Sequence, residues 1–208
     1  MAMNWGQIKA TVAAYANRTD LTAMMPSFLE LAEQRIYNGG AEGDVPPLRL
    51  SNMLTVVNPA SLTLPADFIE MKRVSAVMDT TYKKALDFKP LEITAAMEGA
   101  SGDPQYYSLQ NTSLVYAPTF TYPVEIIYYA RFAPLVNDVD TNWLTSNAST
   151  AYISAMLIEV GYYLRDNDLA QRELSRFASA VNALQAQDDG NKHSGAQLRM
   201  MQDAKRLI

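Results

Sequence analysis

His193 is the only imidazole in the sequence, and the 208 residues contain no cysteine. Ser-His-Asp and Cys-His triads and the common zinc sites therefore cannot be assembled within one chain. His193 also lies in the polar run 189–195, which offers no fixed neighbour to orient an imidazole as a general base. We interpret it as a solvated side chain. We expect no catalytic residue, no metal and no cofactor, so the chain is predicted not to be an enzyme.

A second candidate is an acidic loop, since Asp138, Asp140 and Asn142 have the opening spacing of a calcium-binding loop. The match ends there. Trp143 stands where the sharp turn needs glycine, and Ser149 stands where the bidentate glutamate is needed. We interpret these residues as a polar loop ahead of a helix.

Glycine-rich, carboxylate and tyrosine patterns are also weak evidence for a catalytic or binding site. The run 39–43 lacks the Lys-Ser/Thr pair of a phosphate-binding loop, and Glu42 and Asp44 would repel an anion. Nothing distinguishes a glycosidase pair among the 22 acidic residues. Tyrosines between residues 106 and 129 could stack on sugars or single strands. However, strands favour tyrosine and no basic groove accompanies these side chains.

The composition predicts a well-packed protein, with 49% hydrophobic and 19% charged residues. A net charge of −5 makes it a poor candidate for wrapping nucleic acid over its whole surface. No stretch approaches the roughly 20 apolar residues of a membrane span, and the N-terminus lacks the features of a signal peptide. We expect synthesis and folding in a cytoplasm, without a membrane.

The elements that must carry any function are helices at both ends of the chain. Asn4 is the expected cap of the first helix, Pro26 must lie in the first turn of the second, and Asp168 is the expected cap of the fourth. Apolar side chains recur at helical spacing in four segments: Trp5, Ile8, Val12 and Tyr15; Met25, Phe28, Leu29, Ala32 and Ile36; Ile153, Leu157, Val160 and Leu164; and Ala170, Leu174, Phe177, Val181 and Leu184.

The middle of the chain predicts strands, because nine of the ten prolines lie between residues 46 and 134. Residues 110–112 form a predicted hairpin turn, and residues 91–98 a short helix. Short turns between neighbouring strands indicate an antiparallel sheet. The predicted strands are 53–57, 68–77, 106–109, 113–116 and 124–129.

We therefore predict an α+β fold. Residues 1–44 and 136–188 form a four-helix domain from both chain ends, residues 45–135 form a small inserted antiparallel β-sheet domain, and residues 189–208 form an extended C-terminal tail. The tail carries a charge of +2, whereas the rest of the chain carries −7. A frayed terminus is one interpretation of the tail, and a docking segment is the other.

The order of these pieces resembles the head-to-tail adaptor (connector) proteins of tailed bacteriophages. The resemblance spans nearly the whole chain and consists of turns and apolar positions. Its stretches are the Trp5 helix with Arg18-Thr19-Asp20-Leu21 and residues 28–36; Leu64-Pro65-Ala66-Asp67-Phe68; the hairpin from Pro104-Gln105-Tyr106 to Pro118, with residues 124–130 and Pro134-Leu135; and the helix pair ending in Lys192-His193-Ser194-Gly195.

The resemblance implies a virion protein of the neck, at the head–tail interface. A dodecameric ring of identical subunits would dock beneath the portal protein, with the helical domain against the portal. Tail proteins (a nozzle, hub or stopper) would attach on the opposite side. Genomic DNA would pass through the lumen without specific binding, which suits acidic subunits.

The resemblance also implies that the tail grips the portal. Apolar and cationic side chains alternate in it: Leu198, Arg199, Met201, Lys205, Arg206 and Ile208. Two alternatives remain open at this point. One is a virion-associated cell-wall hydrolase, which needs a carboxylate pair facing one cleft. The other is a carbohydrate- or receptor-binding module that uses Tyr106 and Tyr116 of the sheet.

Overall fold

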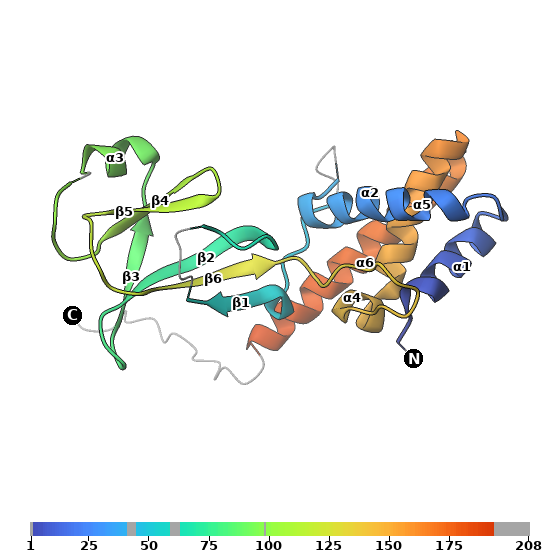
Figure 1. Ribbon diagram of the computed structural model, residues 1–208. Coiled ribbons are helices and arrows are strands. Elements are labelled where there is room, and N and C mark those ends of the chain that lie inside the picture. Colours follow the sequence, from blue (N-terminus) through green and yellow to red (C-terminus); the bar gives the residue numbers. More distant parts are fainter. Residues whose placement is uncertain (1, 41–44, 59–62, 98, 194–208) are drawn as a thin grey trace, which may run out of the picture.

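The computed structural model describes residues 2–40, 45–58, 63–97 and 99–193. These residues form six α-helices and one six-stranded sheet, which confirms the α+β class. Helices from both chain ends gather on one side and the sheet lies on the other (Figure 1). None of the described helices is long and apolar enough to span a membrane.

The helical part is built around one central helix, α5 (Ser149–Leu164), which packs against α1 (Trp5–Tyr15), α2 (Met25–Asn38), α4 (Trp143–Asn147) and α6 (Asn167–His193). A helix that is apolar on nearly all sides belongs in a core, and α5 is buried from Ala151 to Gly161 except at the half-buried Glu159. α1, α2, α5 and α6 are the four predicted helices. The short α4 was not predicted, so the four-helix description is incomplete.

The helix ends follow from local chemistry. Asn4 caps α1 as predicted: its side-chain oxygen accepts from the Gln7 N–H, and the Gln7 side chain accepts from the Asn4 N–H. Pro26 lies in the first turn of α2. The predicted Asp168 cap of α6 is wrong, because the Leu169 N–H binds Asp166 instead.

The sheet has the order β1-β6-β2-β3-β4-β5. Its strands are β1 (Leu54–Val57), β2 (Phe68–Val77), β3 (Lys83–Phe88), β4 (Tyr106–Gln110), β5 (Ser113–Ala117) and β6 (Val124–Ala130). The β4–β5 hairpin turns at Asn111, which has a φ of 55°. The five predicted strands and this turn are confirmed, and the short helix α3 (Leu91–Ala96) lies within the predicted 91–98.

β3 was not predicted, and it breaks the antiparallel pattern. It pairs antiparallel with β2 but parallel with β4, where Asp87 lies opposite Tyr106 and Phe88 opposite Tyr107. Only Leu86 is buried in this strand. A strand that buries a single side chain carries almost no hydrophobic alternation for sequence reasoning to detect.

Buried apolar side chains form two clusters. One lies among the helices and includes Trp5, Phe28 and Phe177. The other lies in the sheet and includes Val74 and Ile126. The chain leading into the sheet packs with the helices, since Leu48, Leu50 and Met53 belong to the helical cluster. The division of the chain at residue 45 stays a prediction.

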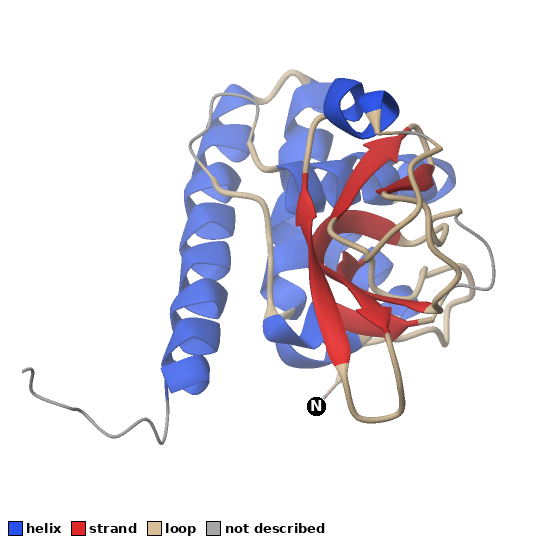
Figure 2. Ribbon diagram, turned by 90° about the vertical axis from the view of Figure 1, so that its left-hand side faces the viewer, coloured by secondary structure: helices blue, strands red, loops and turns tan. Residues whose placement is uncertain are grey.

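α6 extends further than the sequence indicated, because it continues through Gly190 to His193. Figure 2 shows this long helix along one margin of the molecule. Lys192 pairs with both Asp188 and Asp189, one turn earlier, which stabilises the helix across the glycine. Residues 189–193 therefore belong to α6 and not to an extended tail, whereas residues 194–208 lie outside the described part of the chain.

Candidate functional site

The end of α6 is attached to the chain that enters the sheet by two side-chain hydrogen bonds. Asp188 accepts a hydrogen bond from the Ser51 N–H at 3.0 Å, and Gln185 donates to the Pro47 carbonyl at 3.1 Å. The helix is thus held to the chain that enters the sheet. The predicted portal-docking residues lie in the part of the chain outside the described residues: Leu198, Arg199, Met201, Lys205, Arg206 and Ile208.

Electrostatics support this attachment. Burial alone would raise the pKa of Asp188, but hydrogen bonds from Lys192 and Ser51 outweigh it and lower that pKa below its usual value. The same contacts with Asp188 and Asp189 raise the pKa of Lys192. Both groups are charged at neutral pH, so the last turn of α6 is tied to residue 51 by an ionised carboxylate.

The acidic loop is a structured connection between β6 and α4. Asp140 accepts from the Val136 and Asn137 N–H groups at 2.9 and 2.7 Å, and these bonds lower its pKa. Asp138 pairs with Lys9 of α1, and Asn142 caps α4. The interpretation of a polar loop ahead of a helix is confirmed, because the loop leads directly into α4 and Asn142 caps that helix.

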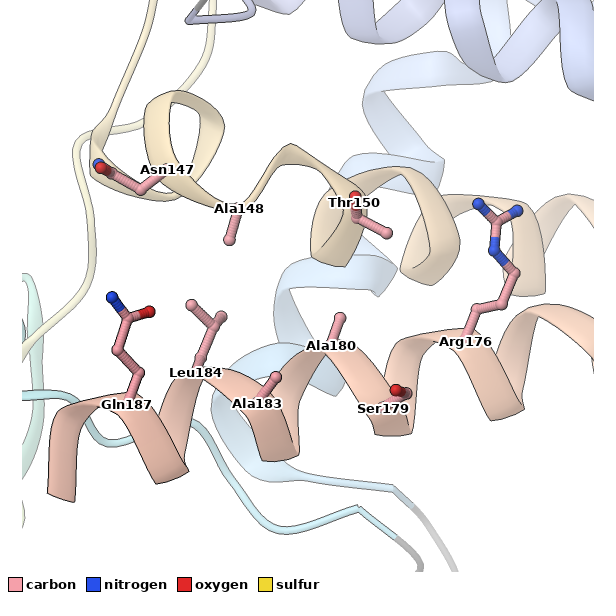
Figure 3. A pocket seen from close by; sticks show the side chains of 9 residues that line it. All are labelled: Asn147, Ala148, Thr150, Arg176, Ser179, Ala180, Ala183, Leu184 and Gln187. Atoms are coloured by element: carbon pink, nitrogen blue, oxygen red, sulfur yellow. The ribbon is translucent and has the colours of Figure 1, made fainter. Parts of the chain in front are cut away.

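A groove runs between the start of α5 and the second half of α6 (Figure 3). It has a volume of about 460 Å³. Alanines 148, 180 and 183 and Leu184 give it an apolar floor, with Arg176 towards one end and Gln187 towards the other. An adjoining hollow continues past Gln187 to Asp188 and Asn191. The end of α6 therefore borders an open surface.

Tyr37 and Arg49 form a joint between the helices and the sheet. Arg49 donates to the Tyr37 carbonyl at 2.9 Å and to Glu70 of β2 at 2.7 Å. The Tyr37 hydroxyl accepts from the Phe132 N–H at 3.1 Å, and burial raises the pKa of this hydroxyl to about 12. The Arg131 guanidinium lies 5.7 Å from the Tyr37 ring centre. Both chain crossings between the two parts thus meet at Tyr37.

A buried hydrogen-bond chain fixes the second crossing further. The Tyr152 hydroxyl donates to Glu33 at 3.2 Å and accepts from Asn142 at 3.0 Å, while Asn142 also donates to the Ala133 carbonyl. Burial raises the pKa of Glu33, and the Tyr152 hydrogen bond partly opposes this shift. Burial also raises the pKa of Tyr152. The network joins α2, α5 and the loop before α4.

Three further carboxylates that are buried or half-buried form ion pairs. Glu159 of α5 pairs with Arg35 of α2 at 2.7 Å, and Glu173 pairs with Arg176 at 3.1 Å. Glu125 of β6 pairs with Lys83. Within the described ranges no group of three or more histidine or acidic side chains could hold a metal ion. These pairs connect secondary-structure elements or stabilise a helix.

The tyrosines of the sheet contribute mainly to packing. Tyr107 belongs to the apolar cluster of the sheet, and Tyr116 packs against it. Burial raises the pKa of Tyr116 to about 12. The Tyr116 ring lies 5.1 Å from that of Phe120. Lys89 lies over the Tyr106 ring, which is half-buried. Each of these contacts covers part of a ring that a stacking platform would need to expose.

The described residues therefore define a structural subunit: two packed parts, a fixed joint between them and open surfaces on the helical side. The family model described as SU10 adaptor protein matches residues 3–200, and the chain belongs to this family. It is a bacteriophage adaptor, a structural protein, which implies association with portal and tail components and a place in the virion neck. Comparison with curated proteins gave no match.

Proposed function

We propose that twelve copies of this adaptor form a closed ring beneath the portal, join the capsid to the tail and continue the DNA channel. The observation that carries the proposal is the family match along residues 3–200. The fixed joint at Tyr37 supports it, because a connector must hold its two faces at a constant angle. The subunit is synthesised in the host cytoplasm and then incorporated into the virion.

The helical part faces the portal in this proposal, and the sheet part faces the tail proteins (a nozzle, hub or stopper). Residues 194–208 carry a charge of +2, whereas the whole chain carries −5. Leu198, Met201 and Ile208 would supply apolar anchors on the portal, each worth about 1.5–3 kcal/mol when fully buried. Arg199, Lys205 and Arg206 would mainly speed and orient docking.

The channel follows from the same charge balance. In this proposal the lumen of the ring is acidic, which is supported by the net charge of −5 on each subunit. Phosphates are repelled by such a surface, so DNA passes without specific binding. Screening limits this repulsion to within about 10 Å at 0.1 M salt, which is the range that matters inside a narrow channel.

The test is to mix purified adaptor with portal rings and to image the product by electron microscopy. The same experiment is done with a truncated chain that lacks residues 194–208. The truncated chain keeps Lys192, because Lys192 stabilises the end of α6 through Asp188. We expect the truncated protein to remain folded with almost unchanged thermal stability and to lose portal binding. A charge test compares two double variants that each remove two positive charges. Arg199→Gln with Lys205→Gln changes the tail, and Lys72→Gln with Lys84→Gln on the sheet is the control.

Three results would contradict the proposal. If the full chain does not decorate portal rings, the adaptor does not bind the portal. If the truncated chain binds with undiminished affinity, residues 194–208 are a frayed end and the helical body makes the joint. If the sheet pair weakens binding as much as the tail pair, the effect reflects total charge and not the tail.

A further inference from the structure

We propose that residues 136–140 of one copy enter the α5–α6 groove of a second copy, the groove shown in Figure 3. This inference rests on the proposed ring and adds the contact that joins neighbouring subunits. The loop and the groove are built from different residues. A contact between them is therefore heterologous, which is the type that generates a ring when the rotation closes.

The loop carries the two most exposed large hydrophobic side chains of the described residues. Val136 is 72% exposed and Val139 is 77% exposed. Single exposed apolar residues are ordinary on a surface, but two valines three positions apart on a structured loop are a preformed apolar projection. Burying such side chains is favourable, so a complementary surface would be expected to cover them.

The loop is rigid enough to act as a projection. Asp140 holds the Val136 and Asn137 N–H groups, and the Gly6 N–H donates to the Asp138 carbonyl at 2.9 Å. A side-chain carbon added at Gly6 would lie 3.2 Å from Asp138, so glycine there lets the loop lie closely on α1. A preorganised loop loses little conformational freedom on binding.

The groove has matching chemistry. Its alanines and Leu184 leave room for valine side chains, while Asn147, Thr150 and Gln187 can bind the backbone of an incoming loop. Charge also matches in sign: Asp138 is paired with Lys9 but its side chain is 72% exposed, and Arg176 at the groove is paired with Glu173 but its side chain is 46% exposed. Opposite charges across an interface set its orientation and register.

The contact is too small to hold a ring together by itself, since stable interfaces bury roughly 1,200–2,000 Å². One loop in one groove covers only part of that area. We therefore expect the contact to form when portal binding has raised the local concentration of subunits. Docking against the portal and docking between copies then reinforce each other.

Disulfide trapping tests the contact directly, because the chain has no cysteine of its own. The variant combines Val139→Cys on the loop with Ala183→Cys in the groove. Mixed with portal rings and a mild oxidant, it should form covalent oligomers that appear as a ladder on a non-reducing gel. The matched control joins Val56→Cys to Ala183→Cys, because Val56 of β1 is also well exposed, at 57%.

The outcomes separate this inference from the proposed function. Decorated portal rings with a ladder for Val139→Cys/Ala183→Cys and none for the control support the contact. Decorated rings without that ladder, or with equal ladders for both variants, overturn the contact and leave the adaptor function intact. Undecorated portal rings overturn both.

A charge exchange provides an independent measurement. Asp138→Arg and Arg176→Asp should each reduce the number of subunits retained per portal ring, and the two substitutions combined should restore it. Each substitution also removes an ion pair within the subunit, Asp138 with Lys9 or Arg176 with Glu173. Circular dichroism is therefore used to check that each variant is folded. If the double variant retains no more subunits than the weaker single one, Asp138 does not face Arg176.

Discussion

Replacing Tyr152 by phenylalanine should destabilise the subunit more than its small change in shape suggests. The Tyr152 hydroxyl is the middle of the buried chain that joins Glu33 to Asn142. Phenylalanine keeps the ring but leaves the Glu33 carboxylate without this donor. Asn142 loses one acceptor and keeps the Ala133 carbonyl at 3.0 Å.

The magnitude follows from these losses. Leaving a buried polar group without its partner costs about 1–3 kcal/mol. For a chain of this length, each kcal/mol lowers the melting temperature by about 2–4 °C. This loss of stability should depend on pH. Burial raises the pKa of Glu33, and the Tyr152 hydrogen bond partly offsets that rise. Without that bond the pKa of Glu33 rises further, so the loss is larger at pH 7 than at about pH 4.

The assay is thermal unfolding at both pH values, with Tyr163→Phe as the control. Tyr163 is 54% exposed and its ring packs on Phe28, so removing its hydroxyl should change little. Equal melting temperatures for the two variants at pH 7 would refute the role of the buried hydroxyl. A larger loss at pH 4 than at pH 7 would refute the coupling to Glu33.

Three further predictions concern the helical part. Burial raises the folded-state pKa of Glu33, so ionisation of this carboxyl at higher pH disfavours folding. In urea titrations, Glu33→Gln should therefore stabilise the subunit at pH 7 and leave its stability unchanged at about pH 4. Arg35→Met should cost about 3–5 kcal/mol by leaving Glu159 unpaired, whereas Arg35→Met with Glu159→Met should be nearly neutral in a double-mutant cycle. Gly161→Ala places a carbon 2.9 Å from the Ala170 nitrogen and should cost about 1–3 kcal/mol, whereas Gly190→Ala, in open space, should not lower the melting temperature.

Local patterns in the sequence predicted most elements. β2 was predicted with its observed bounds, Phe68–Val77, because a β-prone run lies between Pro65 and Pro90. β3 was not predicted, because its side chains are mostly polar or exposed. The polar run 189–195 indicated the start of an extended tail, but the Asp188–Lys192 pair and the contact of Asp188 with Ser51 extend α6 to His193. The i,i+4 pair is visible in the sequence, but the contact with Ser51, 137 positions away, leaves no local signal.

The joint and the groove were beyond sequence reasoning for a related reason. Tyr37 meets Phe132 from 95 positions away, and Tyr152 meets Glu33 from 119 positions away. No spacing rule connects residues so far apart in one sequence. Asn142 is partly an exception, since it was predicted to lie in a polar loop ahead of a helix, although neither its cap of α4 nor its contact with Tyr152 was predicted. The docking role of residues 194–208 stays a prediction.

The position of α5 has a consequence during synthesis on the ribosome. α2 ends at Asn38 and α5 begins at Ser149, so α1 and α2 wait for about 110 residues before their main partner is translated. At 5–20 residues per second this interval lasts roughly 5–20 s. Side chains such as Ile8, Val12 and Phe28 stay uncovered by α5 throughout, while the strands of the sheet are completed first. The helical part therefore closes only as α5 and α6 emerge.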